Sequence, residues 1–204
     1  MSRYNLKVEN ICKSFDEKPV IKKFSAEFNN TKKYGICGKN GCGKTTLLKI
    51  IAGLIRQDSG LINHNQKGLE LNACYVDNNP RGFFMRLNGL DNLHFFGALN
   101  GFSRSETEAF IKLHFKIFKM ESFILKALNT ISLGQTQLLN IAKSYLMEPQ
   151  IVLYDEVFSS LDEDNKELFI DFINSYHSKT DSIHIFTSHD RHLINEITDE
   201  VFML

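Results

Sequence analysis

The chain has 204 residues, which is enough for one folded domain and leaves little room for a second. Lys plus Arg and Asp plus Glu each number 24, so the formal net charge is zero, which argues against a broad basic surface for nucleic acid. The hydrophobic fraction of 43% excludes a chain that is mainly disordered.

The first third of the chain is rich in apolar and alternating segments that are typical of strands. These segments predict strands over 6–11, 24–28, 34–37, 60–63 and 69–76. A helix is predicted over 44–54, with Leu47, Leu48, Ile51 and Leu54 on the one face that an amphipathic helix buries.

The rest of the chain is first helical and then alternates strands with helices. We predict helical structure from 87 to 128, helices over 134–146, 162–176 and 190–197, and strands over 151–154, 183–187 and 201–204. Such alternation predicts an α/β fold with a mainly parallel sheet and flanking helices, plus an N-terminal antiparallel β region. The expected organisation is a single domain, 1–204, with a helical subdomain of about 87–147 inserted in the core.

No stretch approaches the roughly 18 consecutive apolar residues that a membrane-spanning helix needs, and the N-terminus does not resemble a signal peptide. The four cysteines form no Cys-x-x-Cys pair and lie in no histidine cluster, so neither a zinc site nor a disulfide framework is expected.

The segment Gly38 to Thr45 fits the phosphate-loop pattern G-x-x-x-x-G-K-[ST] between a predicted strand and a predicted helix. Glycines let backbone N–H groups curl around phosphate oxygens, and the helix N-terminus adds a favourable dipole. We therefore expect Lys44 to reach the β- and γ-phosphates of a nucleotide, and the Thr45 hydroxyl to ligate Mg²⁺.

Two further strands end in groups suited to phosphate chemistry. The apolar run 151–154 is followed by Asp155, which suits Mg²⁺, and by Glu156, which suits a general base or a residue that positions the attacking water. His189 follows the strand predicted over 183–187, at the edge of a parallel sheet where ligands bind, and is placed to contact the γ-phosphate. The residues thus predict Lys44, Glu156 and His189 as the catalytic set.

Together these residues resemble the ATP-binding cassette (ABC) ATPases, a family with a P-loop NTPase core, over nearly the whole chain. The resemblance rests on the phosphate loop through Thr46, on Ile131-Ser132-Leu133-Gly134-Gln135 as the family signature, on Asp155-Glu156, on Ser159-Ser160-Leu161-Asp162, on His189, on Phe15 and on Tyr75-Val76-Asp77-Asn78-Asn79-Pro80. The signature separates this family from kinases and GTPases that share only the phosphate loop.

The resemblance implies a set of nucleotide contacts. Those expected in the subunit's own site are Phe15 on the adenine, then Gly38, Asn40, Gly41, Cys42, Gly43, Lys44, Thr45 and Thr46 of the loop, and Asn78. Metal contacts are expected from Thr45, Asp155 and Asn78. In the family, the signature contacts the γ-phosphate of the opposite subunit, so Ser132 and Gly134 are expected to act in trans, with Asp162 at the dimer seam. Ser132 is also a good N-cap for the helix that follows it.

The resemblance further implies a nucleotide-binding subunit of an ABC transporter, which hydrolyses ATP with Mg²⁺ as a homo- or heterodimer. It would lie peripherally at the cytoplasmic face of a membrane and drive a separate membrane-spanning subunit, with no nucleic acid as partner. The runs 155–162 and 86–93 are similar to the haem-exporter subunit of cytochrome c maturation, and small peptide or antibiotic exporter subunits are almost as similar. A nucleotide-gated switch with weak hydrolysis and a soluble, non-transport ABC ATPase are the alternatives.

Some residues depart from the family pattern. Leu133 replaces the first glycine of the signature, Asn78 replaces the usual glutamine, and Val157-Phe158 replaces the common Pro-Thr. An aromatic-rich stretch, 83–96, falls where the family accepts a coupling helix from the membrane subunit. We expect more than half of its phenylalanines to be core residues of the helical subdomain.

Overall fold

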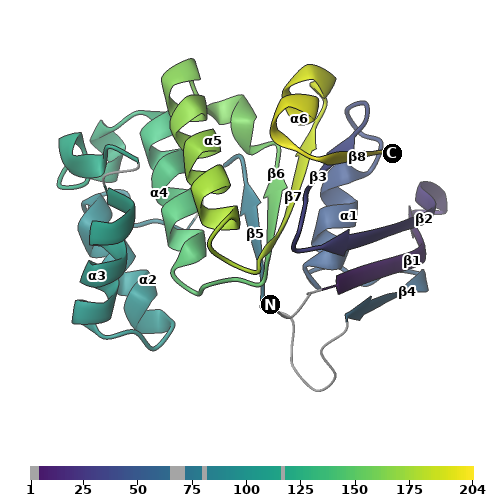
Figure 1. Ribbon diagram of the computed structural model, residues 1–204, viewed down its shortest axis with the longest axis horizontal. Helices are drawn as coiled ribbons and strands as arrows, with labels where there is room; N and C mark the ends of the chain where they lie inside the picture. The colour runs from purple at the N-terminus through teal and green to yellow at the C-terminus, as the bar shows by residue number, and fades with distance from the viewer. Residues whose placement is uncertain (1–4, 65–71, 80–81, 116–117) are drawn as a thin grey trace. The chain divides into compact units, whose positions relative to one another are not determined.

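The structure is a computed structural model that describes residues 5–64, 72–79, 82–115 and 118–204 (Figure 1). The chain divides into two compact units, and each is described by itself. The first, which we call the sheet unit, comprises Met1–Tyr75, Gln150–Glu156 and Lys179–Leu204. The second, the helical unit, comprises Val76–Pro149 and Val157–Ser178.

The sheet unit begins with a three-stranded antiparallel sheet in the order β2-β1-β4. Its strands are β1 Asn5–Phe15, β2 Lys18–Asn29 and β4 Ser59–His64. Buried and exposed residues alternate along the first half of β1, so Leu6 and Val8 enter the core while Lys7 faces solvent. The predicted antiparallel region is therefore confirmed, with longer strands than the apolar pattern alone indicated.

The second sheet has five strands in the order β5-β6-β7-β3-β8. Its strands are β3 Lys33–Cys37, β5 Ala73–Asp77, β6 Ile151–Asp155, β7 Ile183–Ser188 and β8 Glu200–Met203. β3 pairs in parallel with β7 and β8, and β6 pairs in parallel with β7. Every residue of β6 and β7 is buried, as expected for strands covered on both faces. The prediction of an α/β fold with a mainly parallel sheet is confirmed. The strand predicted over 69–76 begins outside the described residues, and the structure has it from Ala73.

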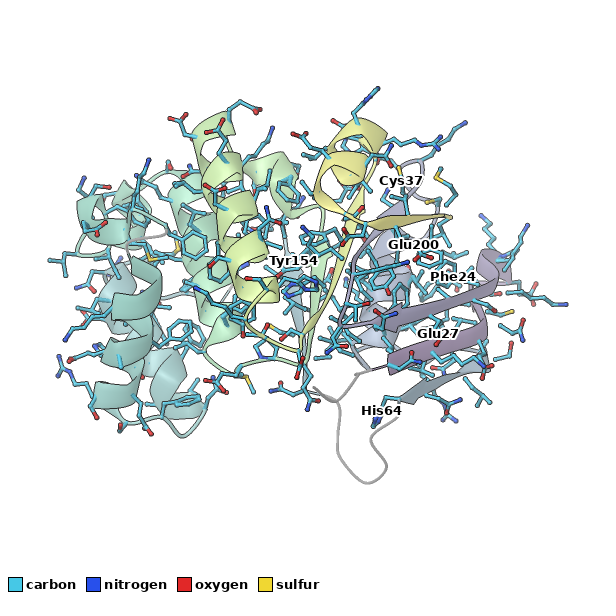
Figure 2. All side chains as sticks on the ribbon, in the orientation of Figure 1. Phe24, Glu27, Cys37, His64, Tyr154 and Glu200 are labelled. Atoms are coloured by element: carbon cyan, nitrogen blue, oxygen red, sulfur yellow. The ribbon has the colours of Figure 1, made fainter. Side chains whose placement is uncertain are left out.

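Aromatic stacking runs across the centre of this sheet. Tyr154 on β6 is labelled in Figure 2. Its ring is nearly parallel to that of Phe186 on β7, with 4.3 Å between the two centroids. Its hydroxyl lies 3.1 Å from Nδ1 of His184, which is fully buried. His184 is therefore a core residue of β7.

The residues described in the sheet unit include two helices, α1 Lys44–Ile51 and α6 Arg191–Ile197. α1 ends three residues earlier than the prediction of 44–54. Gly53 adopts φ 73°, a left-handed conformation that ends a helix, and Leu54 is 63% exposed rather than buried. The expectation that Leu54 lies on the buried face is wrong for this reason.

The helical unit contains four α-helices and three short 3₁₀ helices among its described residues. They are α2 Gly89–Leu99, α3 Arg104–Phe115, η1 Met120–Ser122, η2 Leu128–Thr130, α4 Leu133–Tyr145, η3 Val157–Ser160 and α5 Glu163–His177. Phe172 on α5 packs against Phe118 and Tyr145, with ring centroids 4.6 and 4.8 Å apart. No helix in the described part of the chain combines the length and the apolar character that crossing a membrane requires.

The aromatic stretch of the helical unit is more exposed than the sequence predicted. Of its phenylalanines, Phe83 is buried and Phe96 is partly buried, whereas Phe84 is 46% and Phe95 39% exposed. Lys143 on α4 lies over both Phe83 and Phe96, 4.7 and 4.8 Å from their ring centroids. The expectation that more than half of these phenylalanines are core residues is therefore wrong.

Candidate functional site

The turn between β3 and α1 has the backbone that a phosphate loop requires. Gly43, the residue before α1, adopts φ 108°. A Cβ at this position would stand 2.9 Å from Cγ1 of Val20 on β2, so both the conformation and the close approach demand glycine. The loop thus joins a buried strand to a helix N-terminus, the arrangement that presents backbone N–H groups to an anion. Within the loop, Asn40, Gly41 and Thr45 are exposed, whereas Gly38, Cys42 and Thr46 are partly buried.

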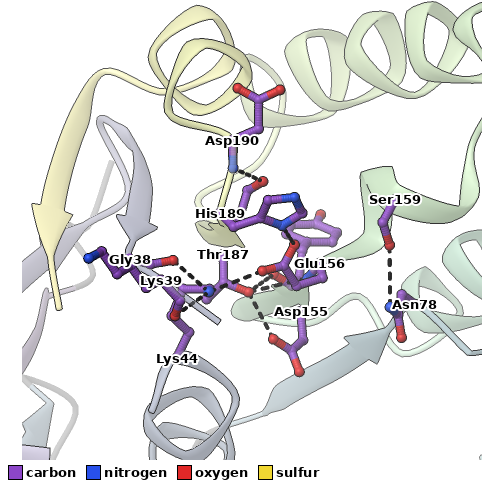
Figure 3. Close-up of polar contacts among 12 residues, drawn as sticks. Gly38, Lys39, Lys44, Asn78, Asp155, Glu156, Ser159, Thr187, His189 and Asp190 are labelled. Atoms are coloured by element: carbon purple, nitrogen blue, oxygen red, sulfur yellow. Dashed lines mark hydrogen bonds and ion pairs between the residues drawn. The ribbon is translucent and has the colours of Figure 1, made fainter. Parts of the chain in front are cut away.

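Lys44, the first residue of α1, is only 5% exposed. Its Nζ donates hydrogen bonds to the carbonyl oxygens of Gly38 and Lys39, at 2.8 and 3.3 Å (Figure 3). The same Nζ lies 3.2 Å from Oε1 of Glu156. The buried ammonium group is thereby held by two loop carbonyls and by one carboxylate, which offsets the cost of its burial.

Glu156 lies between Lys44 and His189. It follows β6 with φ 53°, a left-handed conformation that is uncommon for a residue with a side chain. Its Oε2 is 3.1 Å from Nδ1 of His189, which follows β7 (Figure 3). The parallel pairing of β6 with β7 aligns Asp155 with Thr187, so both strands end at the same edge of the sheet. The structure therefore brings the three predicted catalytic side chains together.

Asp155, the last residue of β6, is 7% exposed. Its Oδ2 accepts a hydrogen bond of 2.7 Å from the Tyr75 hydroxyl, and its Oδ1 accepts one of 2.8 Å from the Thr187 hydroxyl. Neither contact is predicted by the sequence motifs, although Tyr75 opens the run 75–80 that resembles the family. No local pattern could have identified them, because the strand register decides which side chains stand beside Asp155.

Phe15, predicted to stack on adenine, lies at the end of β1 and is 44% exposed. Lys13 Nζ is 5.3 Å from its ring centroid and 2.7 Å from Oδ1 of Asp58. Asp58 Oδ2 also accepts a hydrogen bond from the backbone N–H of Ser14. These bonds hold the pKa of the Asp58 carboxyl below its ordinary value, mainly through Lys13. Asp58 thus fixes the end of β1 that carries Phe15 through these two hydrogen bonds. The sequence motifs predict neither Lys13 nor Asp58 as part of the site.

The signature lies in the helical unit, at the start of α4. Ser132 is the N-cap of this helix, as predicted, and its side chain accepts a hydrogen bond from the Gln135 N–H at 3.1 Å. The Gln135 side chain accepts from the Ser132 N–H in return, which completes a capping box. Gly134 is buried, and a Cβ there would stand 2.9 Å from the Asn165 amide nitrogen. Leu133, the departure from the family signature, is 59% exposed.

Two other predicted contact residues also lie in the helical unit. Asp162 is the N-cap of α5, and its side chain accepts from the Asn165 N–H at 2.9 Å. Asn78 donates a hydrogen bond of 3.3 Å from its amide to the Ser159 hydroxyl (Figure 3). The segment before Asn78 is fixed by Gln137 on α4, which donates to the Asp77 carbonyl at 2.8 Å.

Comparison with known proteins places these features in a family. Residues 21–159 match a family model described as ABC transporter. Over 98% of this chain and 73% of the relative, the sequence is 32% identical to an ABC transporter ATP-binding protein of Methanocaldococcus jannaschii. It is 28% identical to the spermidine/putrescine import ATP-binding protein PotA of Fusobacterium nucleatum, across 100% of this chain and 56% of that protein.

A solved structure shares the fold. CbiO1 of Clostridium perfringens, described as part of the ABC transporter complex CbiONQ, superposes with a TM-score of 0.85. The match covers 99% of this chain and 85% of that one, at 22% sequence identity.

Proposed function

This chain belongs to the ABC transporter family of ATP-binding proteins, and from that premise we propose that it hydrolyses ATP to ADP and phosphate to drive a separate membrane subunit. The observation that carries the proposal is the cluster of Lys44, Glu156 and His189 at the phosphate loop. Family membership supports nucleotide binding. The cluster would supply a cation to bind the phosphates and a carboxylate to accept a proton from the attacking water.

Each member of the cluster has a role that its contacts support. Lys44 would leave Glu156 and bind the β- and γ-phosphates of ATP, since its Nζ already lies at the loop carbonyls. Glu156 would accept a proton from the attacking water as the oxygen bonds to the γ-phosphorus and the bond to the β–γ bridging oxygen breaks. His189, 3.1 Å from Glu156, would orient this carboxylate and contact the γ-phosphate.

Asp155 and Thr45 would supply oxygen donors of the kind that Mg²⁺ prefers. The buried carboxylate of Asp155 accepts two hydroxyl hydrogen bonds and, within the described part of the chain, forms no ion pair. A buried negative charge held in this way suits a divalent cation. When bound, Mg²⁺ would neutralise charge on the phosphates; Asn78 is the third residue predicted to contact it.

We further propose that two chains sandwich two ATP molecules. Ser132 and Gly134 would then contact the γ-phosphate bound to the opposite subunit, with Asp162 at the seam. The capping box supports this role, because it fixes the start of α4, where backbone N–H groups and the helix dipole favour an anion.

The helical unit carries an exposed apolar surface suited to a membrane partner. We call it the aromatic surface; its residues are Phe84, Met85, Leu87, Phe95 and Leu99, each between 39% and 65% exposed. Clustered exposed apolar side chains mark interaction sites, and an apolar helix of a membrane subunit would fit such a surface. The protein would then act peripherally at the cytoplasmic face of the membrane.

The specific transport system is a separate proposal. The resemblance of 155–162 and 86–93 to the haem-exporter subunit of cytochrome c maturation supports that system. The name of the Fusobacterium relative describes a polyamine importer instead. The direction of transport and the cargo therefore depend on the membrane partner.

Steady-state ATP hydrolysis by the purified chain tests the proposal. The Glu156→Gln variant should lose at least 100-fold in turnover number, since a general base contributes about 10²–10⁴-fold. Glu167→Gln, which removes an exposed carboxylate on α5, is the matched control and should retain full activity. Bound ATP without hydrolysis in the wild type would contradict the ATPase and favour the nucleotide-gated switch.

A further inference from the structure

The hydroxyl groups of Tyr75 and Thr187 both donate hydrogen bonds to the carboxylate of Asp155, and the sequence motifs assign no role to either contact. From this geometry we infer that Tyr75 and Thr187 are positioning residues, which orient the carboxylate of Asp155 for Mg²⁺. The inference rests on the proposed role of Asp155 in binding this ion. Each hydroxyl binds a different carboxylate oxygen, at 2.7 and 2.8 Å. The carboxylate is therefore fixed at both of its oxygens.

The bonds come from two different strands of the central sheet. Tyr75 belongs to β5 and Thr187 to β7, and both strands neighbour β6, which carries Asp155. A carboxylate bonded from only one side keeps a free rotation about its last torsion, which is broad for aspartate. Bonds from two sides remove that freedom and fix the plane of the carboxylate before any cation arrives.

The bonding pattern leaves acceptor capacity for a cation. An ionised carboxylate has about four lone-pair sites, two on each oxygen. The hydroxyls of Tyr75 and Thr187 use one site on each oxygen, so each oxygen keeps a second. Neutral hydroxyls suit this task, because a lysine or arginine in their place would neutralise Asp155 and compete with the metal.

Thr187 also fixes the neighbouring catalytic residue. Its Oγ1 donates to Asp155 and accepts a hydrogen bond of 3.2 Å from the backbone N–H of Glu156. Thr187 is 1% exposed, so these bonds form away from solvent. One hydroxyl thereby sets the spacing between the metal carboxylate and the proposed general base, whose left-handed backbone needs such support.

The test measures how strongly Mg²⁺ tightens nucleotide binding. A fluorescent ATP analogue is titrated with Mg²⁺ present and with EDTA, and the ratio of the two dissociation constants is the Mg²⁺ enhancement. Tyr75→Phe and Thr187→Val should each reduce this enhancement about tenfold, as loss of groups that orient metal ligands does. The affinity in EDTA should stay unchanged, whereas a merely structural defect would weaken both measurements.

Matched variants separate the hydroxyl from the fold. Thr187→Ser keeps the hydroxyl and should retain the enhancement. Tyr154→Phe removes a neighbouring buried hydroxyl that faces His184, and should also leave the enhancement unchanged. Tyr75 is only partly buried, so Tyr75→Phe remains informative even if Thr187→Val unfolds the core.

Asp155→Asn distinguishes this inference from the proposed function. If Asp155→Asn abolishes the enhancement while Tyr75→Phe and Thr187→Val retain it in full, the positioning role is overturned and the proposed metal site stands. If Asp155→Asn retains the enhancement, the metal role of Asp155 fails and the inference fails with it.

Discussion

Lys44 shows how much of the site one side chain organises. Its ammonium group is nearly buried, yet it contacts two carbonyl oxygens of the loop and the carboxylate of Glu156, the residue after β6. The local motif predicted this residue because a phosphate loop keeps lysine at a fixed place in the chain. Its contact with Glu156 depends instead on the sheet, which brings together residues that the chain separates.

The ion pair between Lys13 and Asp58 should make the stability of the protein depend on pH. Because Lys13 lowers the folded-state pKa of the Asp58 carboxyl below 3.8, the pair stabilises the protein above that pH. This contribution should disappear as the pH falls through the lowered pKa. The midpoint of urea unfolding should therefore be lower for Asp58→Asn than for the wild type at pH 7, and the two midpoints should converge as the pH falls through the lowered pKa of Asp58.

Lys13→Gln removes the other partner and should show the same convergence. A difference between Asp58→Asn and the wild type that stays equally large at every pH from 7 down to acid unfolding would contradict the assigned pair. The size of the effect at pH 7 should be small, since Asp58 is partly exposed.

The residues that sequence reasoning missed share one physical property. Thr187 lies 32 residues from Asp155, and Tyr75 lies 80 residues from it. Lys44, Asp155 and His189 could be predicted, because each belongs to a short motif at the end of one strand. Side chains that orient those motifs are selected by strand order and register, and a one-residue shift of register would replace them.

At the scale of elements, the ends of α1 follow from single residues. The helix begins at the phosphate loop because Gly43 allows the loop to turn into it, and it ends because Gly53 adopts a left-handed conformation. The apolar periodicity of 44–54 continued past this end, so the pattern placed Leu54 in the core. Glycine conformation, rather than hydrophobic spacing, decided the boundary.

Gly53→Ala should lower the free energy of unfolding by about 1 kcal/mol, because a Cβ penalises the left-handed conformation. A Cβ at Gly53 meets nothing within 4 Å, so a steric clash would not add to this cost. Urea unfolding measures the change. Gly53→Asn should cost less, since asparagine tolerates the conformation better. Equal losses for the two variants would contradict a conformational origin.

The central strands were the most predictable elements, and the aromatic stretch was the least. β6 and β7 are short apolar runs, and burial on both faces leaves little other role for such runs. The stretch 83–96 is also rich in apolar residues, but part of it forms the exposed aromatic surface. Apolar composition cannot distinguish a core from a surface that a partner chain covers, so this expectation failed.

At the scale of the whole molecule, the proposed contact residues are divided between the two units. Lys44, Asp155, Glu156 and His189 belong to the sheet unit, whereas the signature belongs to the helical unit. The sandwich proposal assigns the signature to the nucleotide of the opposite subunit. Nucleotide binding would then link each sheet unit to the helical unit of another chain.

Glu156→Gln should form a dimer that depends on ATP, because the nucleotide would stay intact between the two subunits. Static light scattering coupled to size exclusion should give twice the monomer mass with ATP and Mg²⁺, and the monomer mass with ADP. Ser132→Ala in the same background should weaken the dimer by removing the signature hydroxyl. A monomer that retains bound ATP would contradict the sandwich for the isolated chain.

The contact between Lys44 and Glu156 has a consequence for how the site responds to salt. Because Nζ of Lys44 lies 3.2 Å from Oε1 of Glu156, a nucleotide phosphate that binds Lys44 would displace this carboxylate instead of meeting an unpaired cation. Binding of this kind exchanges one ion pair for another. The electrostatic contribution to the binding free energy is therefore smaller than in a pocket whose lysine has no carboxylate partner. Its affinity would therefore vary weakly with ionic strength, and an uncharged residue at 156 would relieve the competition and favour ADP as well as ATP.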